Sequence, residues 1–374
     1  MKKSTAPILL AGKTWANADL LYASGFRAPD PIVFLDGGRE RFMVVSRLEL
    51  GRARKTCPGV RVVTPEDLRL RGRARRRWSA WAVGVVRLAG ARSVRVAGDF
   101  PVAAARALER CGVRVRVEEG ALYPRRAVKT AAEQAALRAV QTATCGAMRS
   151  AFALLRRARA DTRGVLRLGR AVLTAEAVRR HINAYLLARD CLGGEPIVAC
   201  GAQAADPHCV GSGPLRAGQP IVLDIFPQHQ ASGYWGDLTR TVVKGRADAA
   251  TRRLFRAVKR AQAAALAALR PGVRADRVHR AAARELERCG FRTDPRAEPP
   301  SGFIHSTGHG VGLEVHEAPS VSAGQGPLKL GHVVTIEPGL YYPGVGGVRV
   351  EDTVVLVPGG FDRLASCPVF LEIP

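Results

Sequence analysis

The sequence of 374 residues contains no run of about 18 uninterrupted apolar residues, which is the length that a membrane-spanning helix needs. We therefore expect no membrane association. The start, Met1-Lys2-Lys3, leads into a mixed stretch that ends at Leu10 and is too short for an export signal. The eight cysteines include no CxxC pair and no regular spacing, which is typical of a reduced intracellular protein. These absences predict a cytoplasmic location.

Acidic residues and lysine are scarce. Basic residues outnumber acidic ones by 58 to 32, a formal net charge of +26, and only eight of the 58 are lysines. Such a charge usually suggests nucleic acid or another anionic partner. Six arginines also lie close together: Arg69, Arg71, Arg73, Arg75, Arg76 and Arg77. The arginines are nevertheless scattered among Ala, Gly and Val along the whole chain, as in proteins of GC-rich genomes. We therefore expect no nucleic-acid partner and interpret the run as a solvated helix face.

Hydrophobic residues make up 47% of the chain and charged residues 24%, which excludes wholesale disorder. The first third alternates short apolar runs with helical patterns and predicts a small α/β domain. Its expected elements are a strand pair at 32–35 and 42–45, helices at 78–88 and 102–111, and strands at 93–96 and 113–117. The Glu-, Gly- and Arg-rich stretch 118–126 indicates a boundary, so we predict domains 1–124 and 125–374.

The second domain repeats one order of elements. Thr130, with Glu133 three residues later, has the spacing of a capping box and predicts a long helix that ends near Arg159. We further expect helices at 174–190, 252–269 and 275–289, and strands within 197–243 and 299–357. Helices followed by strands, twice, predict two architecturally similar halves.

Two apolar strands in the first half each contain one acid, Asp224 and Asp237, separated by a turn at Ser232-Gly233. A buried carboxylate is costly without a partner. If the strands fold back on each other, the two acids are expected to face one another. Two facing carboxylates repel unless a cation lies between them.

The same arrangement recurs downstream with Glu337 and Glu351, joined through the Gly-rich segment 343–346. Four carboxylates on two hairpins suit a pair of hard divalent cations such as Mn²⁺ or Mg²⁺, with Co²⁺, Fe²⁺ or Zn²⁺ as alternatives. Between the hairpins lie three of the chain's eight histidines, His305, His309 and His316, among glycines. One imidazole added to the four acids makes a five-residue dinuclear centre.

Each feature also has a structural interpretation. An acid on a strand is often paired with an arginine, and Arg240 and Arg349 are available here. A single histidine is usually structural, and a Gly-rich segment is often a surface loop. A purely structural explanation would require all of these interpretations to be true at once across four strands. The sequence therefore favours the metal site.

The motifs resemble those of the pita-bread metallopeptidases, which include aminopeptidase P, prolidase and methionine aminopeptidase. The similarity covers 129–374 and is carried by Asp224, Gly236-Asp237-Leu238-Thr239-Arg240-Thr241, Thr307-Gly308-His309-Gly310-Val311-Gly312-Leu313, Thr335-Ile336-Glu337-Pro338-Gly339 and Val348-Arg349-Val350-Glu351-Asp352. Two segments, 18–22 and 28–31, are similar to the creatinase/prolidase-type N-terminal domain. The loop between Asp224 and Asp237 is about two residues longer than is usual in the family.

The resemblance implies an α/β chain in which a small N-terminal α/β domain precedes a curved antiparallel sheet flanked by helices. It implies five metal ligands: Asp224, Asp237, His309, Glu337 and Glu351. Two divalent ions, Mn²⁺ first among the candidates, would generate a hydroxide that attacks the scissile carbonyl, with Glu337 moving the proton. It also implies substrate-side roles for His316, His208 and His305, and a supporting role for Arg349 beside the carboxylates.

By the same resemblance, the substrate is a peptide with proline at its second position, or an X-Pro dipeptide, and the protein is a homodimer or homotetramer. Three alternatives remain. A methionine-type aminopeptidase generally lacks the N-terminal domain, and a metal-free creatinase-like hydrolase would have lost several of the acidic ligands. A non-catalytic pita-bread protein that binds RNA or protein partners is suggested by the charge alone.

Overall fold

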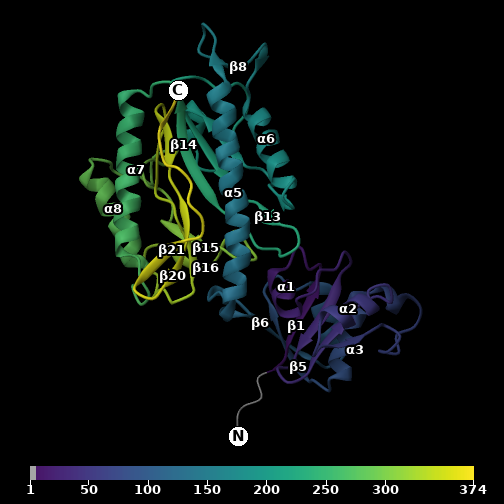
Figure 1. Ribbon diagram of the computed structural model, residues 1–374. Helices are drawn as coiled ribbons and strands as arrows, with labels where there is room; N and C mark the ends of the chain where they lie inside the picture. The colour runs from purple at the N-terminus through teal and green to yellow at the C-terminus, as the bar shows by residue number, and fades with distance from the viewer. Residues whose placement is uncertain (1–5) are drawn as a thin grey trace. The chain divides into compact units, whose positions relative to one another are not determined.

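The computed structural model describes residues 6–374, so the basic start Met1–Lys3 lies outside the described part. The chain divides into two compact units, Met1–Arg126 and Ala127–Pro374, and the division falls within the 3₁₀ helix η2 (Pro124–Ala127) (Figure 1). Among residues 6–374, none of the helices has both the length and the hydropathy needed to cross a membrane.

The first unit is built on one mixed sheet of six strands in the order β4-β3-β2-β1-β5-β6. Its elements are β1 (Ile8–Gly12), α1 (Ala18–Ser24), β2 (Ile32–Asp36), β3 (Arg41–Val44), α2 (Leu50–Thr56), β4 (Arg61–Val63), η1 (Gly72–Arg76), α3 (Trp78–Leu88), β5 (Ser93–Ala97), α4 (Val102–Arg110) and β6 (Arg114–Glu118). The predicted hairpin β2–β3 and both predicted helices are confirmed. The arginine run is exposed, as expected, but it surrounds a short 3₁₀ helix rather than an α-helix face.

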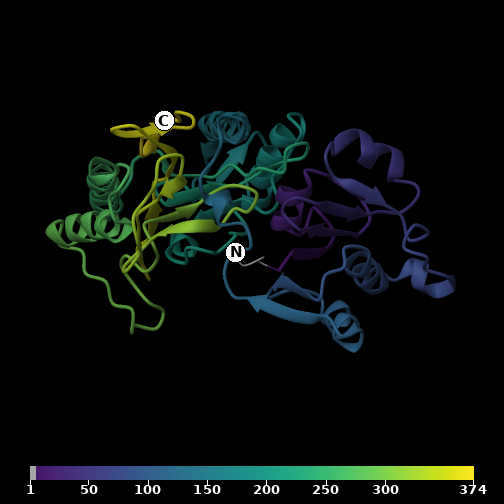
Figure 2. The same cartoon turned by 90° about the horizontal axis from the view of Figure 1, so that it is seen from below.

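Four long helices frame the second unit: α5 (Ala131–Arg157), α6 (Ala175–Leu187), α7 (Ala249–Ala268) and α8 (Ala275–Arg288). The capping box predicted at Thr130 is present in full at the start of α5. Apolar side chains of α5 and α6 share one core with β12 and β14, while those of α7 and α8 share another with β17 and β20. Each pair of helices therefore covers its own strands (Figures 1 and 2).

The strands of this unit form two main sheets, with orders β11-β12-β14-β22 and β16-β15-β17-β20-β21. The strands near the candidate site are β11 (Ile197–Cys200), β12 (Pro220–Ile225), β14 (Leu238–Lys244), β15 (Gly308–Gly310), β17 (Val333–Ile336), β18 (Gly339–Tyr342), β19 (Gly346–Arg349) and β20 (Asp352–Val357). The remaining strands are β7 (Arg159–Ala160), β8 (Leu166–Leu168), β9 (Ala171–Val172), β10 (Cys191–Leu192), β13 (Gln228–His229), β16 (Glu317–Val321), β21 (Gly360–Arg363) and β22 (Glu372–Ile373). The predicted succession of two similar halves is confirmed.

The first acidic hairpin is present, but its register differs from the predicted one. Asp224 lies opposite Thr239, and Asp237 precedes the first residue of β14. The connection adds its own bridge between Gln228 and Trp235 in the same register, and the predicted turn at Ser232-Gly233 is present, since the Gly233 N–H donates to His229 O (2.8 Å). Asp224 and Asp237 are consequently diagonal neighbours on one face rather than a directly facing pair.

The second hairpin is interrupted at its acids. β17 pairs with β20 up to Ile336 and Asp352, and β18 pairs with β19 from Gly339 and Arg349 onward. Glu337 and Glu351 occupy the break between the two ladders. The Glu337 backbone N–H donates to Thr307 O (2.8 Å), and that of Glu351 donates to Thr239 O (3.1 Å). The expectation of acids in mid-strand is therefore wrong for this pair, because each acid bonds to a third strand or loop.

Arg240 joins the two halves beneath the acids. Its side chain is almost completely buried and donates to the backbone oxygen of Glu351 and to Asp352 Oδ1 (2.8 Å). A buried guanidinium requires such partners, and removing one member of a buried ion pair typically costs about 3–5 kcal/mol. Arg240 thus fixes the segment that carries Glu351 against β14, the strand that follows Asp237.

Candidate metal centre and active site

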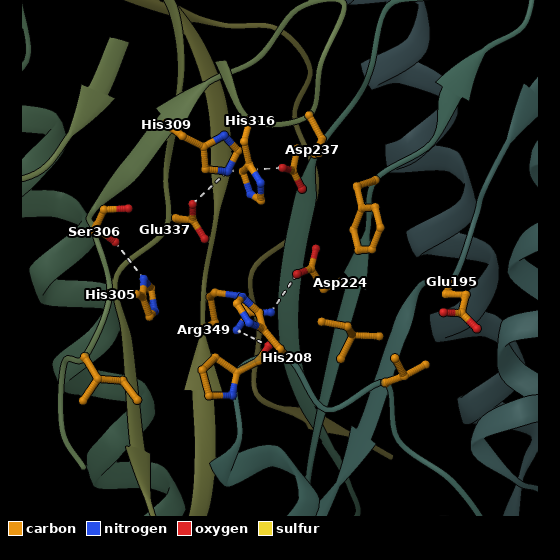
Figure 3. A pocket seen from close by; sticks show the side chains of 16 residues that line it. Glu195, His208, Asp224, Asp237, His305, Ser306, His309, His316, Glu337 and Arg349 are labelled. Atoms are coloured by element: carbon orange, nitrogen blue, oxygen red, sulfur yellow. Dashed lines mark hydrogen bonds and ion pairs between the residues drawn. The ribbon is translucent and has the colours of Figure 1, made fainter. Parts of the chain in front are cut away.

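A cavity of about 780 Å³ lies between the two halves of the second unit (Figure 3). All nine predicted site residues lie at it: Glu351 groups with Asp237 and His309, and the other eight line the cavity, namely Asp224, Asp237, Glu337, His208, His305, His309, His316 and Arg349. The remaining lining is mainly apolar and includes Ile197, Val210 and Phe226.

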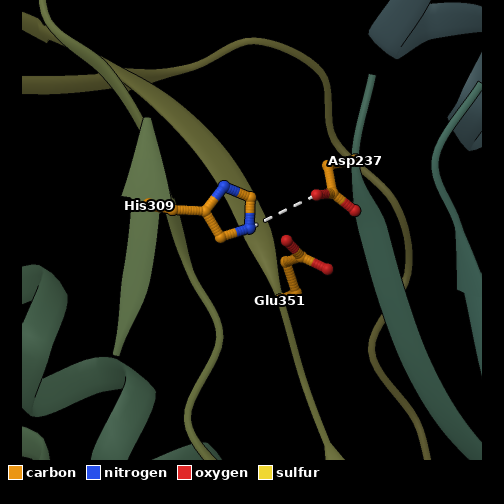
Figure 4. A group of neighbouring side chains, drawn as sticks. All are labelled: Asp237, His309 and Glu351. Atoms are coloured by element: carbon orange, nitrogen blue, oxygen red, sulfur yellow. Dashed lines mark ion pairs between the residues drawn. The ribbon is translucent and has the colours of Figure 1, made fainter. Parts of the chain in front are cut away.

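Asp237, His309 and Glu351 form the tightest group. Each offers one ligand atom, and these atoms lie within 4.8 Å of one another (Figure 4). His309 Nε2 lies 3.6 Å from Asp237 Oδ2. The three side chains come from the start of β14, from β15 and from the break before β20, so a long span of sequence converges here.

The carboxyl groups of Asp237 and Glu351 are electrostatically strained. Burial raises the pKa of Asp237 well above its usual value, and the charges of Glu351, Asp224 and Glu337 raise it further. Burial and the charges of Glu337 and Asp224 likewise raise the pKa of Glu351. A group of acids that oppose one another's ionisation in this way is stabilised by a cation placed among them.

Glu337 approaches the same nitrogen of His309, Nε2, that Asp237 approaches. Its Oε1 is 3.1 Å from His309 Nε2 and accepts a hydrogen bond from Thr335 Oγ1 (3.0 Å). Burial opposes ionisation of Glu337, but the hydrogen bond and charge of His309, together with His305 and Arg349, outweigh it and lower the pKa to about 2. The same contact raises the pKa of His309, although burial alone would lower it.

Asp224 is held by Arg349, whose Nη2 donates to Asp224 Oδ2 at 2.7 Å. The structural interpretation of an acid paired with an arginine thus applies to this acid.

Arg349 Nη1 also donates to the Tyr341 hydroxyl (2.7 Å), which lies 3.0 Å from His305 Nε2. The Ser306 carbonyl can only accept a hydrogen bond, so His305 Nδ1 is protonated and donates to it (2.7 Å). His305 Nε2 therefore accepts a hydrogen bond from the Tyr341 hydroxyl. Burial lowers the pKa of His305 to about 4, so this ring is neutral near pH 7.

His316 and His208 line the cavity from two loops (Figure 3). The His316 ring packs edge-on against His309 with centroids 4.2 Å apart. Burial and the neighbouring His309 lower the pKa of His316. His208 follows the 3₁₀ helix η3 (Gly201–Ala205), where Asp206 Oδ1 accepts its backbone N–H (2.9 Å).

The donor set fits a divalent metal. Asp224 Oδ1 and Glu351 Oε1 are buried and have no hydrogen-bond partner among the described residues. Their second oxygens are held by Arg349 and Thr239, so the orphaned atoms have fixed positions. Carboxylate oxygens with one imidazole suit Mn²⁺, Fe²⁺, Co²⁺ or Zn²⁺. Three of the five predicted ligands form the compact group, while Asp224 and Glu337 line the same cavity with contacts to Arg349 and His309.

Comparison with known protein families identifies the family of this chain. The model of metallopeptidase family M24 matches residues 135–358, which is more than half of the chain and includes all five predicted ligands. The chain belongs to metallopeptidase family M24. An Xaa-Pro dipeptidase of Pyrococcus furiosus is 38% identical over 174 residues, which are 46% of this chain and 47% of that protein. The match thus spans about half the length of this relative.

Two solved structures extend the likeness of this M24 protein to almost the whole chain. The Xaa-Pro dipeptidase from Bacillus anthracis covers 98% of it, with 95% of its own chain aligned, a TM-score of 0.83 and 22% identity. The dipeptidase PepE from Mycobacterium ulcerans covers 99%, with 93% of its own chain aligned, a TM-score of 0.78 and 29% identity. The predicted pita-bread fold is confirmed.

Sequence reasoning missed several residues around the site of this M24 protein. Tyr341 carries no sequence signal, because its contacts depend on the interrupted hairpin. Thr239 and Thr335 lie two residues from Asp237 and Glu337, and the period of a strand places such neighbours on one face. The period of a strand could therefore have identified both threonines from the sequence. Glu195, which also lines the cavity, has no motif around it.

Proposed function

We propose that this chain is a peptidase that depends on two divalent metal ions and hydrolyses the bond before proline, in X-Pro dipeptides or at the N-terminus of longer peptides. The observation that carries the proposal is the convergence of the ligand candidates with three further histidines: four of the five candidates line one cavity, and the fifth, Glu351, groups with Asp237 and His309. The name of the Pyrococcus furiosus relative supports the choice of X-Pro substrates.

Asp224, Asp237, His309, Glu337 and Glu351 would hold the ions, with Mn²⁺ as the preferred candidate. The ions, when bound, supply Lewis acidity that polarises the scissile carbonyl and acidifies water. Asp237 and Glu351, which group with His309, would contribute ligand oxygens together with Asp224 and Glu337. Arg349 fixes the orientation of Asp224, and Thr239 fixes that of Glu351.

Glu337 is the proposed proton acceptor and donor. Its position between Thr335 and His309 leaves its carboxylate at the cavity wall, where a proton from water is transferred and later returned to the proline nitrogen. His316 and His208 are placed to donate hydrogen bonds to the peptide. His305 has both nitrogens engaged by Tyr341 and Ser306, so it shapes the cavity rather than offering a free donor.

The alternatives differ in specific features. The first unit with its six-stranded sheet favours an X-Pro peptidase over a methionine-type aminopeptidase. The presence of all five ligand candidates argues against a metal-free creatinase-like enzyme. It also argues against a non-catalytic partner-binding protein, since the buried acids would then have no purpose.

The test is hydrolysis of Leu-Pro, Leu-Pro-Ala and Met-Ala-Ser by purified protein with added Mn²⁺ and after chelation. We expect cleavage only of the first two, and only with metal. The ratio of the two rates separates a dipeptidase from an aminopeptidase. Cleavage of Met-Ala-Ser but not of the proline peptides, or full turnover after chelation, would contradict the proposal. Asp237→Ala serves as the inactive control.

A further inference from the structure

One acid of the cavity has no role in the chemistry proposed above. Glu195 lines the same cavity as Asp224 and Asp237, yet its side chain is exposed and makes no salt bridge with any residue of the described range 6–374. The other acids of the lining are ligand candidates. If two ions offset the charges of the ligand acids, Glu195 remains as a separate negative charge.

The strand registers fix how far Glu195 lies from the metal ligands. Ile197 pairs with Asp224, and Asp224 pairs with Thr239. Glu195 precedes β11, and Leu192 pairs with Gln228, so these pairings place Glu195 opposite the segment 225–227, with Asp237 on the far side of that segment. Two strand spacings, about 10 Å, therefore separate Glu195 from Asp237. This distance is too large for Glu195 to contact a group bound at the metal ligands.

The backbone that carries Glu195 is anchored. Asn183 of α6 donates from Nδ2 to the oxygen of Gly194 (3.1 Å). A Cβ at Gly193 would lie 2.1 Å from Asn183 Oδ1, so a larger residue would displace the Asn183 side chain. Glu195 is thus presented from a fixed position, although its own side chain reaches solvent.

The cavity is polarised along its length. Asp224 and Glu195 lie on one side in Figure 3, and His305 and Ser306 lie on the other. An X-Pro dipeptide carries its ammonium group on X and its carboxylate on proline. With the ligand acids offset by the ions, Glu195 is the remaining negative charge of the lining, so electrostatic complementarity directs X toward the Glu195 side. The side chain of X then extends along Ile197 and Phe226 toward Glu195.

We propose that Glu195 binds the cationic end of a lysine or arginine side chain at X and makes this protein prefer basic X-Pro substrates. The proposal rests on the proposed function. The apolar stem of such a side chain packs on Ile197 and Phe226, while its charged end reaches the carboxylate near solvent. Because the ion pair is exposed, the expected preference is about two- to five-fold in kcat/KM.

The experiment compares Lys-Pro with Met-Pro, an uncharged substrate with an unbranched side chain, on the metal-loaded protein and its Glu195→Gln variant. We expect the wild type to favour Lys-Pro, and the variant to lose this preference while its rate on Met-Pro stays unchanged. Added salt should reduce the preference of the wild type. Glu195→Lys should instead favour Glu-Pro. Glu287→Gln, which removes an exposed negative charge on α8 outside the cavity lining, is the matched control and should behave as the wild type.

Equal ratios of the Lys-Pro and Met-Pro rates in the wild type and in Glu195→Gln would overturn the proposal, provided that Met-Pro is hydrolysed. If neither dipeptide is hydrolysed, the proposed function fails instead. Calorimetric binding of the same two dipeptides then decides the role of Glu195: a weaker affinity for Lys-Pro alone in Glu195→Gln supports it, and equal affinities refute it.

Discussion

At the scale of single residues, threonine hydroxyls hold two of the acids. Thr239 donates to Glu351 Oε2 (2.8 Å) and Thr335 donates to Glu337 Oε1 (3.0 Å). A neutral donor orients a carboxylate without neutralising it, so its negative charge remains available to a cation. The acids and histidines could be singled out because ionisable side chains are rare among apolar and Gly-rich segments. The role of Tyr341 was not predictable, since its contact with Arg349 depends on a strand pairing that the residue types do not indicate.

Glu337→Gln is expected to reduce turnover by at least 100-fold while the protein stays folded, because an amide keeps the shape of the side chain but cannot accept a proton. The measurement is kcat for Leu-Pro together with the bound metal per chain. Normal metal content with near-normal turnover would show that Glu337 is not the proton acceptor.

His332→Asn is expected to weaken the dependence of folding stability on pH. Burial, with Lys129 and Lys329 nearby, lowers the pKa of His332 to about 4 in the folded state, against about 6.5 when unfolded. The unfolded state therefore binds the proton first, and stability falls as pH decreases from about 6.5 to about 4. Asparagine keeps an acceptor for the Lys329 backbone N–H (3.1 Å to His332 Nδ1) but does not titrate. Urea unfolding at pH 7 and pH 4.5 measures the effect, and equal losses in both proteins would contradict it.

At the scale of elements, periodicity and capping predicted all four long helices of the second unit to within a few residues. Strand registers were less predictable. The sequence placed Asp237 opposite Asp224, whereas Thr239 occupies that position, because the Gln228–Trp235 bridge lies inside the connection. A turn is recognised by its glycine and serine, but its centre depends on pairings on both sides.

Thr130→Ala is expected to destabilise the second unit by about 1 kcal/mol, since it removes the cap at the start of α5. The Thr130 side chain accepts the Glu133 backbone N–H, and the Glu133 carboxylate accepts that of Thr130. Thr142→Ala is the matched control, because Thr142 is an exposed residue inside the same helix and donates only to the Arg138 carbonyl (2.7 Å). Its stability should be unchanged or slightly higher. Equal losses in urea unfolding would refute a capping role.

At the scale of the whole molecule, the repeated order of elements predicted two halves, and the structure gives each half its own sheet and pair of helices. The assignment of the first unit to the creatinase/prolidase type stays a prediction, as do the cytoplasmic location and the homodimer or homotetramer. Sequence motifs do not decide these three properties. Each depends on surface residues, and these are not of distinctive types.

Removal of metal is expected to lower the melting temperature. A ligand that binds only the folded state at 100 times its Kd adds about 2.7 kcal/mol, which corresponds to roughly 5–10 °C for a unit of this size. Calorimetry before and after chelation, and after readdition of Mn²⁺, measures the shift. Asp237→Asn should show a much smaller response. Identical melting with and without metal would contradict a metal site.

Nucleic-acid binding is expected to be weak, independent of sequence and steeply reduced between 50 and 200 mM salt, as for contacts to phosphate alone. The exposed arginines around η1 are the test case. Charge reversal at Arg71, Arg73 and Arg76 should reduce the affinity for nucleic acid only as much as the same change in net charge elsewhere on the surface. Tight binding near physiological salt that disappears with these substitutions would contradict the prediction.

The hydrogen bond from the Glu351 backbone to Thr239 spans 112 residues of sequence, and Arg240 makes a second link at the same place. Neither half of the second unit contains a complete ligand set, because Asp224 and Asp237 belong to one half and His309, Glu337 and Glu351 to the other. Contacts of such long sequence separation form late, after the local helices and hairpins. Metal affinity is therefore a property of the assembled pair of halves, and its appearance during refolding would report the final docking step.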